Sequence, residues 1–301
     1  MIKIGETSYP DFENALADLK AGDILDLGKE TICGQFVIDK DNVTVRNGTF
    51  RGNLGAYEIL NDGYKRGTFR TYTLFIDADH VRLEHVKVIN DNGYQDGQAI
   101  ALMVDGEDLY AKQCVISSYQ DSLFIAPLPE EEYEVRGFAG PLEKRARIMR
   151  HACFESCLIE GSVDFIFGGG EAFFENCEIR SRNIHKPING YVCAPGTPEK
   201  ERYGMVFDHC EFTCEEGMED SVYLARPWRD HGKCLIVGSK IGSHIKKEAY
   251  HDWNKPEARN TSEFKEYGNS DGNSMYRVEW MKQVTDDDLQ YIETLKRRRK
   301  G

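Results

Sequence analysis

Hydrophobic and polar residues alternate along most of the chain in short segments, which is the pattern of β-strands. The segments NVTVRNGTF (42–50), HVRLEHVKVIN (80–90) and CLIVGSKIG (234–242) show this alternation. Gly, Asn or Asp residues, which favour turns, separate such segments. Because a helical period is almost absent between the two ends of the chain, the sequence predicts an all-β protein.

One template, apolar-x-x-small-x-apolar, recurs along the chain. Its fourth position is occupied by Val86, Cys114, Cys157, Cys177, Cys210 and Ser239. A unit of about 20 to 30 residues with variable loops is typical of a solenoid that has strands in every coil. Small residues that recur in register are expected to stack in the interior, so we interpret these cysteines as structural. The predicted architecture is a right-handed parallel β-helix, formed as a single domain by residues 1–301.

A helix is predicted at each end of the chain. The helical period at the start is carried by Phe12, Ala15, Leu16 and Leu19. Pro10 suits the first turn of this helix, and Gly22 suits the turn that follows it. Near the other end, Thr285 and Asp288 form a capping box before an apolar stripe. The C-terminal region 285–301 is therefore expected to be a helix that ends in a solvated basic tail.

Composition narrows the possible partners. Lys and Arg number 38 against 51 Asp and Glu, a net charge of −13 that argues against binding to nucleic acid or anionic membranes. No apolar run approaches the length of a membrane span. The N-terminus shows no secretory signal, so we expect a cytoplasmic location, or secretion if a signal has been removed. The nine cysteines lack metal-ligand spacing, so no metal site is expected.

The candidate chemistry comes from polar residues embedded in apolar strands. Asp164 lies within SVDFIFG, and Gln120 and Asp121 lie between SSY and SLFIAP. Gln98 precedes the run AIALMV, and Arg226 lies in VYLARPW. Burying a carboxylate without a partner is costly, although an outward-facing strand position would leave Asp164 simply exposed. Two carboxylates on adjacent coils would form a pair suited to acid–base or nucleophilic chemistry.

Four short blocks carry a family resemblance: GQAIAL (97–102), YQDSLF (119–124), GSVDFIFG (161–168) and YLARPW (223–228). In sequence and in order they resemble the blocks of the pectin methylesterases, which are carbohydrate esterases of the parallel β-helix type. FKEYGNSDG (264–272) is a weaker match. The resemblance implies hydrolysis of the C6 methyl esters of galacturonate units in pectin or its methylated oligomers, with release of methanol.

The resemblance also implies a role for each embedded polar residue. Asp164 matches the nucleophile, and Asp121 matches the general acid that later acts as base. Arg226 matches the guanidinium that orients Asp164, while Gln98 and Gln120 match the amides that stabilise the oxyanion. No cofactor or metal is implied.

Substrate contacts are expected from a further set of residues. The resemblance places Trp228 as a platform for a sugar ring and Thr73 near the cleft. Phe167 and Tyr119 are further cleft candidates. Core packing is the alternative for such aromatics, most of all for Phe165.

One segment departs from the family pattern. Asp121 and Asp164 are 43 residues apart, about twice the family's separation. The excess falls in the charged, Pro- and Gly-containing stretch 126–147, which we interpret as an inserted loop. We hypothesise that this 126–147 insert restricts the enzyme to short oligomers or chain ends; a surface loop with no effect is the alternative. For the whole protein, the alternatives are a catalytically silent carbohydrate-binding β-helix and an esterase for another acyl ester.

Overall fold

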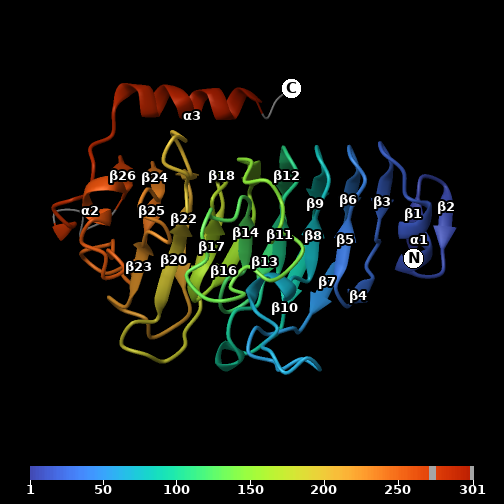
Figure 1. Cartoon of the computed structure of the whole chain (residues 1–301). Helices are drawn as coiled ribbons and strands as arrows, with labels where there is room; N and C mark the ends of the chain where they lie inside the picture. The colour runs from blue at the N-terminus through green and yellow to red at the C-terminus, as the bar shows by residue number, and fades with distance from the viewer. Residues whose placement is uncertain (271–275, 299–301) are drawn as a thin grey trace.

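The computed structural model describes residues 1–270 and 276–298. Over these residues the chain coils into three sheets, which we call A, B and C, and their strands stack along the length of the molecule (Figure 1). A typical coil contributes one strand to each sheet in turn, as β9, β10 and β11 do. Apart from the pairings of β1, neighbouring strands run parallel. The predicted parallel β-helix is therefore confirmed.

Within each sheet, strands from successive coils lie next to one another. Sheet A contains, in spatial order, β2 (Thr7–Tyr9), β1 (Ile2–Ile4), β3 (Ile24–Asp26), β6 (Thr44–Arg46), β9 (Arg82–Glu84), β12 (Leu109–Lys112), β15 (His151–Glu155), β18 (Glu171–Glu175), β21 (Met205–Asp208), β24 (Lys233–Val237) and β26 (Glu263–Tyr267). Sheet B contains β25 (Lys240–Ile241), β22 (Glu211–Cys214), β19 (Glu178–Ser181), β16 (Leu158–Gly161), β13 (Val115–Ser117), β10 (Lys87–Asn90), β7 (Thr49–Gly52) and β4 (Thr31–Cys33). Sheet C contains β23 (Val222–Ala225), β20 (Gly190–Pro195), β17 (Val163–Gly168), β14 (Leu123–Ile125), β11 (Leu102–Val104), β8 (Leu74–Ile76) and β5 (Phe36–Ile38).

Identical side chains stack in register inside the coil. Phe154, Phe174 and Phe207 lie on successive strands of sheet A, with ring centroids 5.0 and 4.7 Å apart. All three are fully buried. The parallel register places like positions of adjacent coils over one another, so large and small residues form separate columns.

The predicted cysteine column is confirmed. The backbone N–H of Cys114 donates to Sγ of Cys157, and that of Cys157 donates to Sγ of Cys177, both at 3.4 Å. One coil further, the N–H of Cys210 donates to Oγ of Ser239 at 3.0 Å. The side chains therefore satisfy backbone donors at the corner between sheets A and B.

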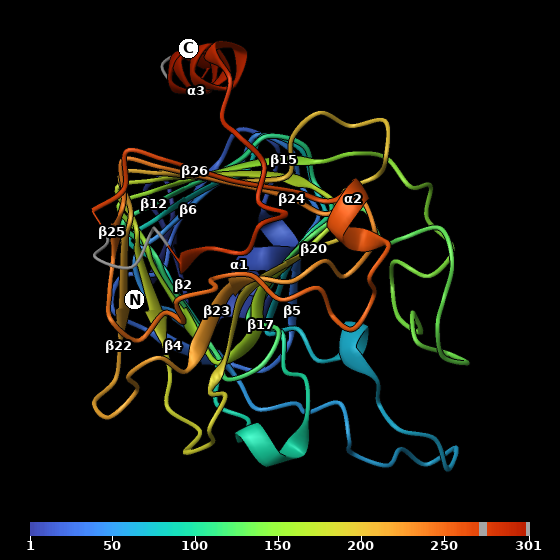
Figure 2. The same ribbon diagram turned by 90° about the vertical axis from the view of Figure 1, so that its left-hand side faces the viewer.

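Helix α1 (Phe12–Asp18) closes the N-terminal end of the coil (Figures 1 and 2). The Phe12 ring lies 5.0 Å from that of Phe36 and 5.3 Å from that of Phe50. Pro10 lies before the helix and not in its first turn as predicted, because Asp11 is the N-cap and accepts a hydrogen bond from the N–H of Asn14 at 2.9 Å.

Helix α3 (Asp286–Arg298) lies across the outer face of sheet A (Figure 2). The predicted capping box is present, since the N–H of Thr285 donates to Asp288 at 2.8 Å. Ile292 packs in a cluster over sheet A. The tail is not simply solvated as expected, because Lys296 forms an ion pair with the buried Asp208 at 2.9 Å. Residues 299–301 of the tail lie outside the described residues.

The remaining short elements are α2 (Ala258–Thr261), η1 (Thr68–Arg70) and η2 (Tyr94–Asp96). In the 264–272 block, Phe264 is fully buried, while residues 271 and 272 lie outside the described residues. Among the described helices, none is long and apolar enough to cross a membrane.

The aromatic column should carry much of the stability. We expect Phe174→Ala to lower the free energy of unfolding by about 3–5 kcal/mol, because it removes a fully buried ring and leaves a cavity between two others. Urea denaturation would measure the change. Tyr267→Ala is the control, since the Tyr267 side chain is exposed and should cost about 0.5 kcal/mol or less. Equal losses of unfolding free energy in the two variants would contradict the stabilising role of the aromatic column.

Candidate active site

The embedded polar residues meet on the outer face of sheet C. A cavity of about 380 Å³, the sheet C cavity, is lined by the five residues predicted for chemistry: Gln98, Gln120, Asp121, Asp164 and Arg226. They come from segments up to 128 residues apart in sequence. Parallel stacking of coils brings them together, so this part of the predicted site is confirmed as a spatial cluster.

Backbone geometry places the two carboxylates side by side. Gln120 pairs with Val163 across adjacent coils, and the N–H of Asp121 donates to the carbonyl of Val163 at 3.1 Å. The residue after each pairing partner is thus an aspartate. Asp121 and Asp164 both have left-handed backbone angles, with φ of 63° and 50°. A register shift between Val163 and Ile166 makes the local bulge that carries Asp164.

Arg226 holds Asp164 through two parallel hydrogen bonds. Its Nε donates to Oδ1 at 2.7 Å and its Nη2 donates to Oδ2 at 2.5 Å. The guanidinium is itself fixed, because it lies 3.7 Å from the ring centre of Tyr191 and 3.6 Å from that of Trp253. Both oxygens of Asp164 are therefore bonded to one cation in one orientation.

Asp121 lies in a contrasting environment. Its side chain is buried, and burial raises the pKa of its carboxyl well above the ordinary value. The neighbouring charge of Asp164 raises this pKa further, while Arg226 and a hydrogen bond from Gln120 lower it. Two adjacent carboxyl groups with only one strongly bound guanidinium favour a protonated Asp121.

The structure separates the predicted substrate contacts into two groups. Trp228 and Phe167 line the sheet C cavity, with ring centroids 5.6 Å apart. Tyr119 does not line it; its ring stacks 3.7 Å from the guanidinium of Arg182. The predicted substrate contact of Thr73 is also corrected, because its side chain is buried and its hydroxyl donates to the carbonyl of Ile89 at 3.0 Å.

Phe165 points the other way from the cavity. Its side chain is fully buried in the main core, which settles it as a core residue. Phe167, two residues on, instead belongs to the separate cluster on the outer face of sheet C.

Several cavity residues were missed by the sequence reasoning. Outside the strands they are Thr68, Phe69, Tyr133, Glu134, Gly137, Phe138, Arg229, Trp253 and Lys255. These residues lie in loops or in η1, outside the repeating template, so no strand pattern marked them. The cations Arg229 and Lys255 offset, near the site, the negative charge of the whole chain. Lys255 also donates to the carbonyls of Pro227 and Trp228, each at 3.1 Å, which fixes the loop of Trp228.

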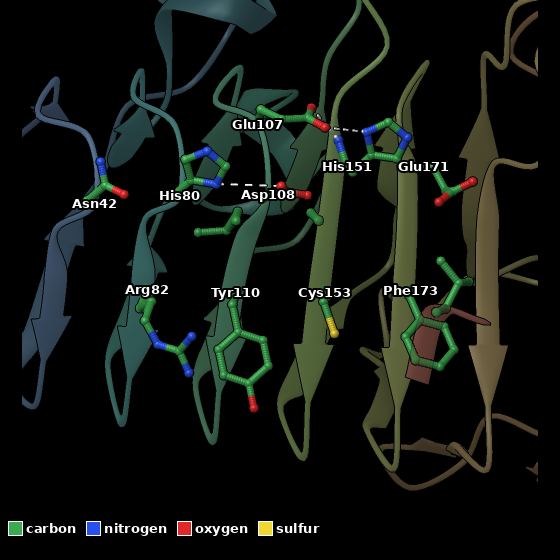
Figure 3. Close-up of a pocket in the computed structure, with 13 residues that line it drawn as sticks. Asn42, His80, Arg82, Glu107, Asp108, Tyr110, His151, Cys153, Glu171 and Phe173 are labelled. Atoms are coloured by element: carbon green, nitrogen blue, oxygen red, sulfur yellow. Dashed lines mark hydrogen bonds and ion pairs between the residues drawn. The ribbon is translucent and has the colours of Figure 1, made fainter. Parts of the chain in front are cut away.

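A larger groove, of about 810 Å³, lies on the outer face of sheet A (Figure 3). Its two histidines are paired with carboxylates: Nδ1 of His151 lies 2.6 Å from Glu107, and Nδ1 of His80 lies 3.5 Å from Asp108. Among the described residues, no group of three or more His, Cys, Asp or Glu side chains is placed to hold a metal ion. The chemistry predicted from the sequence therefore belongs to the sheet C cavity and not to this groove.

The protein is thus a parallel β-helix that carries a pair of carboxyl groups on the outer face of one sheet, and an arginine binds one of the two. Comparison with known families identifies it more closely. The pectinesterase family matches residues 38–128 and 145–293, and the chain belongs to this family.

Similar proteins agree with this assignment. The chain is 29% identical over 71% of its length to a probable pectinesterase/pectinesterase inhibitor from Arabidopsis thaliana, of which it covers 35%. It spans about a quarter to just over half of the length of the curated plant relatives it matches. Its fold is similar to the pectin methylesterase from Yersinia enterocolitica, with a TM-score of 0.74 at 21% identity, covering 94% of this chain and 96% of that one.

A pectin methylesterase solved in complex with a hexasaccharide has the same fold. It has a TM-score of 0.70 at 21% identity and covers 95% of this chain and 91% of that one. This level of identity shows the common fold.

The raised pKa of Asp121 should appear in the pH dependence of stability. Between the ordinary aspartate pKa and the raised one, the folded protein binds a proton that the unfolded chain has lost, so stability falls as pH rises. We expect Asp121→Asn to lose less stability than the wild type as pH rises above the ordinary aspartate pKa of about 4. Thermal unfolding at several pH values would measure this. The control is Asp39→Asn, at an exposed carboxylate, and a wild-type slope in Asp121→Asn would refute the environment described.

Proposed function

We propose that the sheet C cavity hydrolyses the C6 methyl esters of galacturonate units and releases methanol. The observation that carries this proposal is the pair of carboxyl groups of Asp164 and Asp121. Arg226 donates hydrogen bonds of 2.7 and 2.5 Å to Asp164, and Asp121 is buried beside it. One carboxyl group is oriented as a nucleophile, and the other is suited to carry a proton.

The reaction would proceed in two halves. Asp164 attacks the ester carbonyl carbon, and the tetrahedral intermediate collapses to an anhydride while Asp121 gives its proton to the departing methoxide. Water then attacks the anhydride and loses a proton to Asp121, which yields the free galacturonate carboxyl and restores Asp164. Gln98 and Gln120 donate to the oxyanion in both halves, and one such donor is worth about 3–4 kcal/mol.

Substrate recognition would rest on the aromatic and basic lining of the cavity. Trp228 offers a ring to a sugar face, with Trp253 on the neighbouring loop. Arg229 and Lys255 attract an anionic oligogalacturonide despite the net charge of −13. The structural neighbour in complex with a hexasaccharide supports a carbohydrate chain as the ligand class. The cytoplasmic location stays a prediction.

Methanol release tests the function. We expect release from a methylated galacturonide trimer, and we expect Asp164→Ala to lower kcat by about a thousandfold or more, because no other group replaces the nucleophile. Asp39→Asn is the matched control at an exposed carboxylate and should keep wild-type activity. Binding of the trimer without methanol release would favour a silent carbohydrate-binding protein, and release of another acid from another ester would favour a different substrate.

The pH profile tests the role of Asp121. Because the general acid must be protonated in the first half-reaction, kcat/KM should fall as pH rises through the raised pKa of Asp121. Steady-state methanol release across the pH range would measure this limb. In Asp121→Asn the remaining activity should lose the limb, and retention of the same limb would assign it to another group.

A further inference from the structure

Most of the 126–147 insert lies outside the match to the pectinesterase family. Residues 129–144 fall between the two stretches that match the pectinesterase family. Leu128, Phe138 and Leu142 are buried in the cluster on the outer face of sheet C. The insert is therefore packed against the sheet through its apolar side chains.

Close packing fixes the insert against the sheet. Arg145 forms ion pairs with Asp77 and, at 2.8 Å, with Asp105. Gly140 lies so close to the loop before β8 that a Cβ there would be 2.7 Å from the carbonyl oxygen of Phe69. A contact this close requires glycine, so the insert and the 53–73 loop pack backbone against backbone at this point.

The insert contacts loops from coils on both sides of the two aspartates. Toward the N-terminal coils, Arg136 lies 3.4 Å from Asp62 and 4.1 Å from the ring centre of Tyr64. Toward the C-terminal coils, Nη2 of Arg229 donates to the carbonyl of Glu131 at 2.9 Å and its guanidinium stacks 3.9 Å from the ring centre of Tyr133. Figure 2 shows the insert and the 53–73 loop projecting from the same side of the coil.

A second cavity adjoins the sheet C cavity under the insert. This adjoining cavity, of about 410 Å³, shares Thr68, Gln98, Glu134 and Gly137 with the first. Its far part is lined by the exposed ring of Tyr57, over which the Nζ of Lys65 lies at 4.6 Å. A cation at an exposed tyrosine suits a galacturonide unit, because the ammonium can donate to a carboxylate or to a methyl-ester carbonyl oxygen.

We propose that the 126–147 insert confines the substrate to a short methylated galacturonide or a chain end. The reacting ester occupies the sheet C cavity, and a neighbouring unit occupies the adjoining cavity. This inference rests on the proposed function. A polymer would have to continue past the contacts of Arg136 and Arg229, which join the insert to the loops on either side.

Methanol release from two substrates tests the proposal. A fully methylated trigalacturonide and highly methylated pectin are compared at equal ester concentration. The wild type should prefer the trimer, and replacement of residues 130–135 by Gly-Gly should raise the pectin-to-trimer ratio of kcat/KM by about tenfold. Those six residues are exposed, so the buried anchors on either side are kept. The ratio does not depend on the fraction of folded enzyme.

The control removes residues 216 and 217, in an exposed loop that lines neither cavity, and should leave the ratio unchanged. An unchanged ratio in the 130–135 variant, or a wild-type preference for pectin, would overturn the proposal while leaving the esterase function in place. An equal rise in the control would also overturn it. Absence of methanol from both substrates in the wild type would overturn the proposed function and this inference with it.

Discussion

The register between adjacent coils of sheet C determines the site. Gln120 lies opposite Val163, so the next residue of each coil is an aspartate, and both leave the strand with left-handed backbone angles. A slip of one residue would turn one carboxylate into the core and separate it from the other. The columns inside the coil hold this register, because the stacked phenylalanines of sheet A and the cysteines of the column have partners of matching size one coil away. Packing in the interior and chemistry on the surface therefore depend on the same pairing.

The two carboxyl groups of the site lie in different environments, and acid–base chemistry requires this difference. Asp164 has a dedicated guanidinium that is fixed between two aromatic rings. Asp121 has burial and a like charge instead, both of which raise its pKa. If both carboxyl groups were paired with cations, both would be ionised and neither could give a proton to a leaving group. Burial of Asp121 therefore costs free energy of folding at the position where a proton donor is needed.

The repeating strands of the coil explain which parts of the fold and of the site could be predicted from the sequence. The template centres and the embedded polar residues follow the coil, so the β-helix, the cysteine column and the five polar residues of the sheet C cavity could be predicted. Thr73 and Tyr119 were misplaced because a short match says nothing about where a side chain points: Thr73 bonds to a backbone carbonyl inside, and Tyr119 stacks on Arg182. Trp253 could not be found, because it lies in a loop with no repeating neighbour and reaches the site only through the fold.

The loops are also where this chain differs from its family. A solenoid can lengthen a corner without disturbing the strands, since each coil needs only its pairing partners. The 126–147 insert uses this freedom, yet its buried Phe138 and Leu142 and its ion pairs with sheet C make it part of the structure. A mobile loop would move aside for a long polymer at little cost in free energy. The 126–147 insert would first have to lose its contacts through Arg136 and with Arg229. The rigidity of the insert, more than its length, is therefore the property that would select a short substrate.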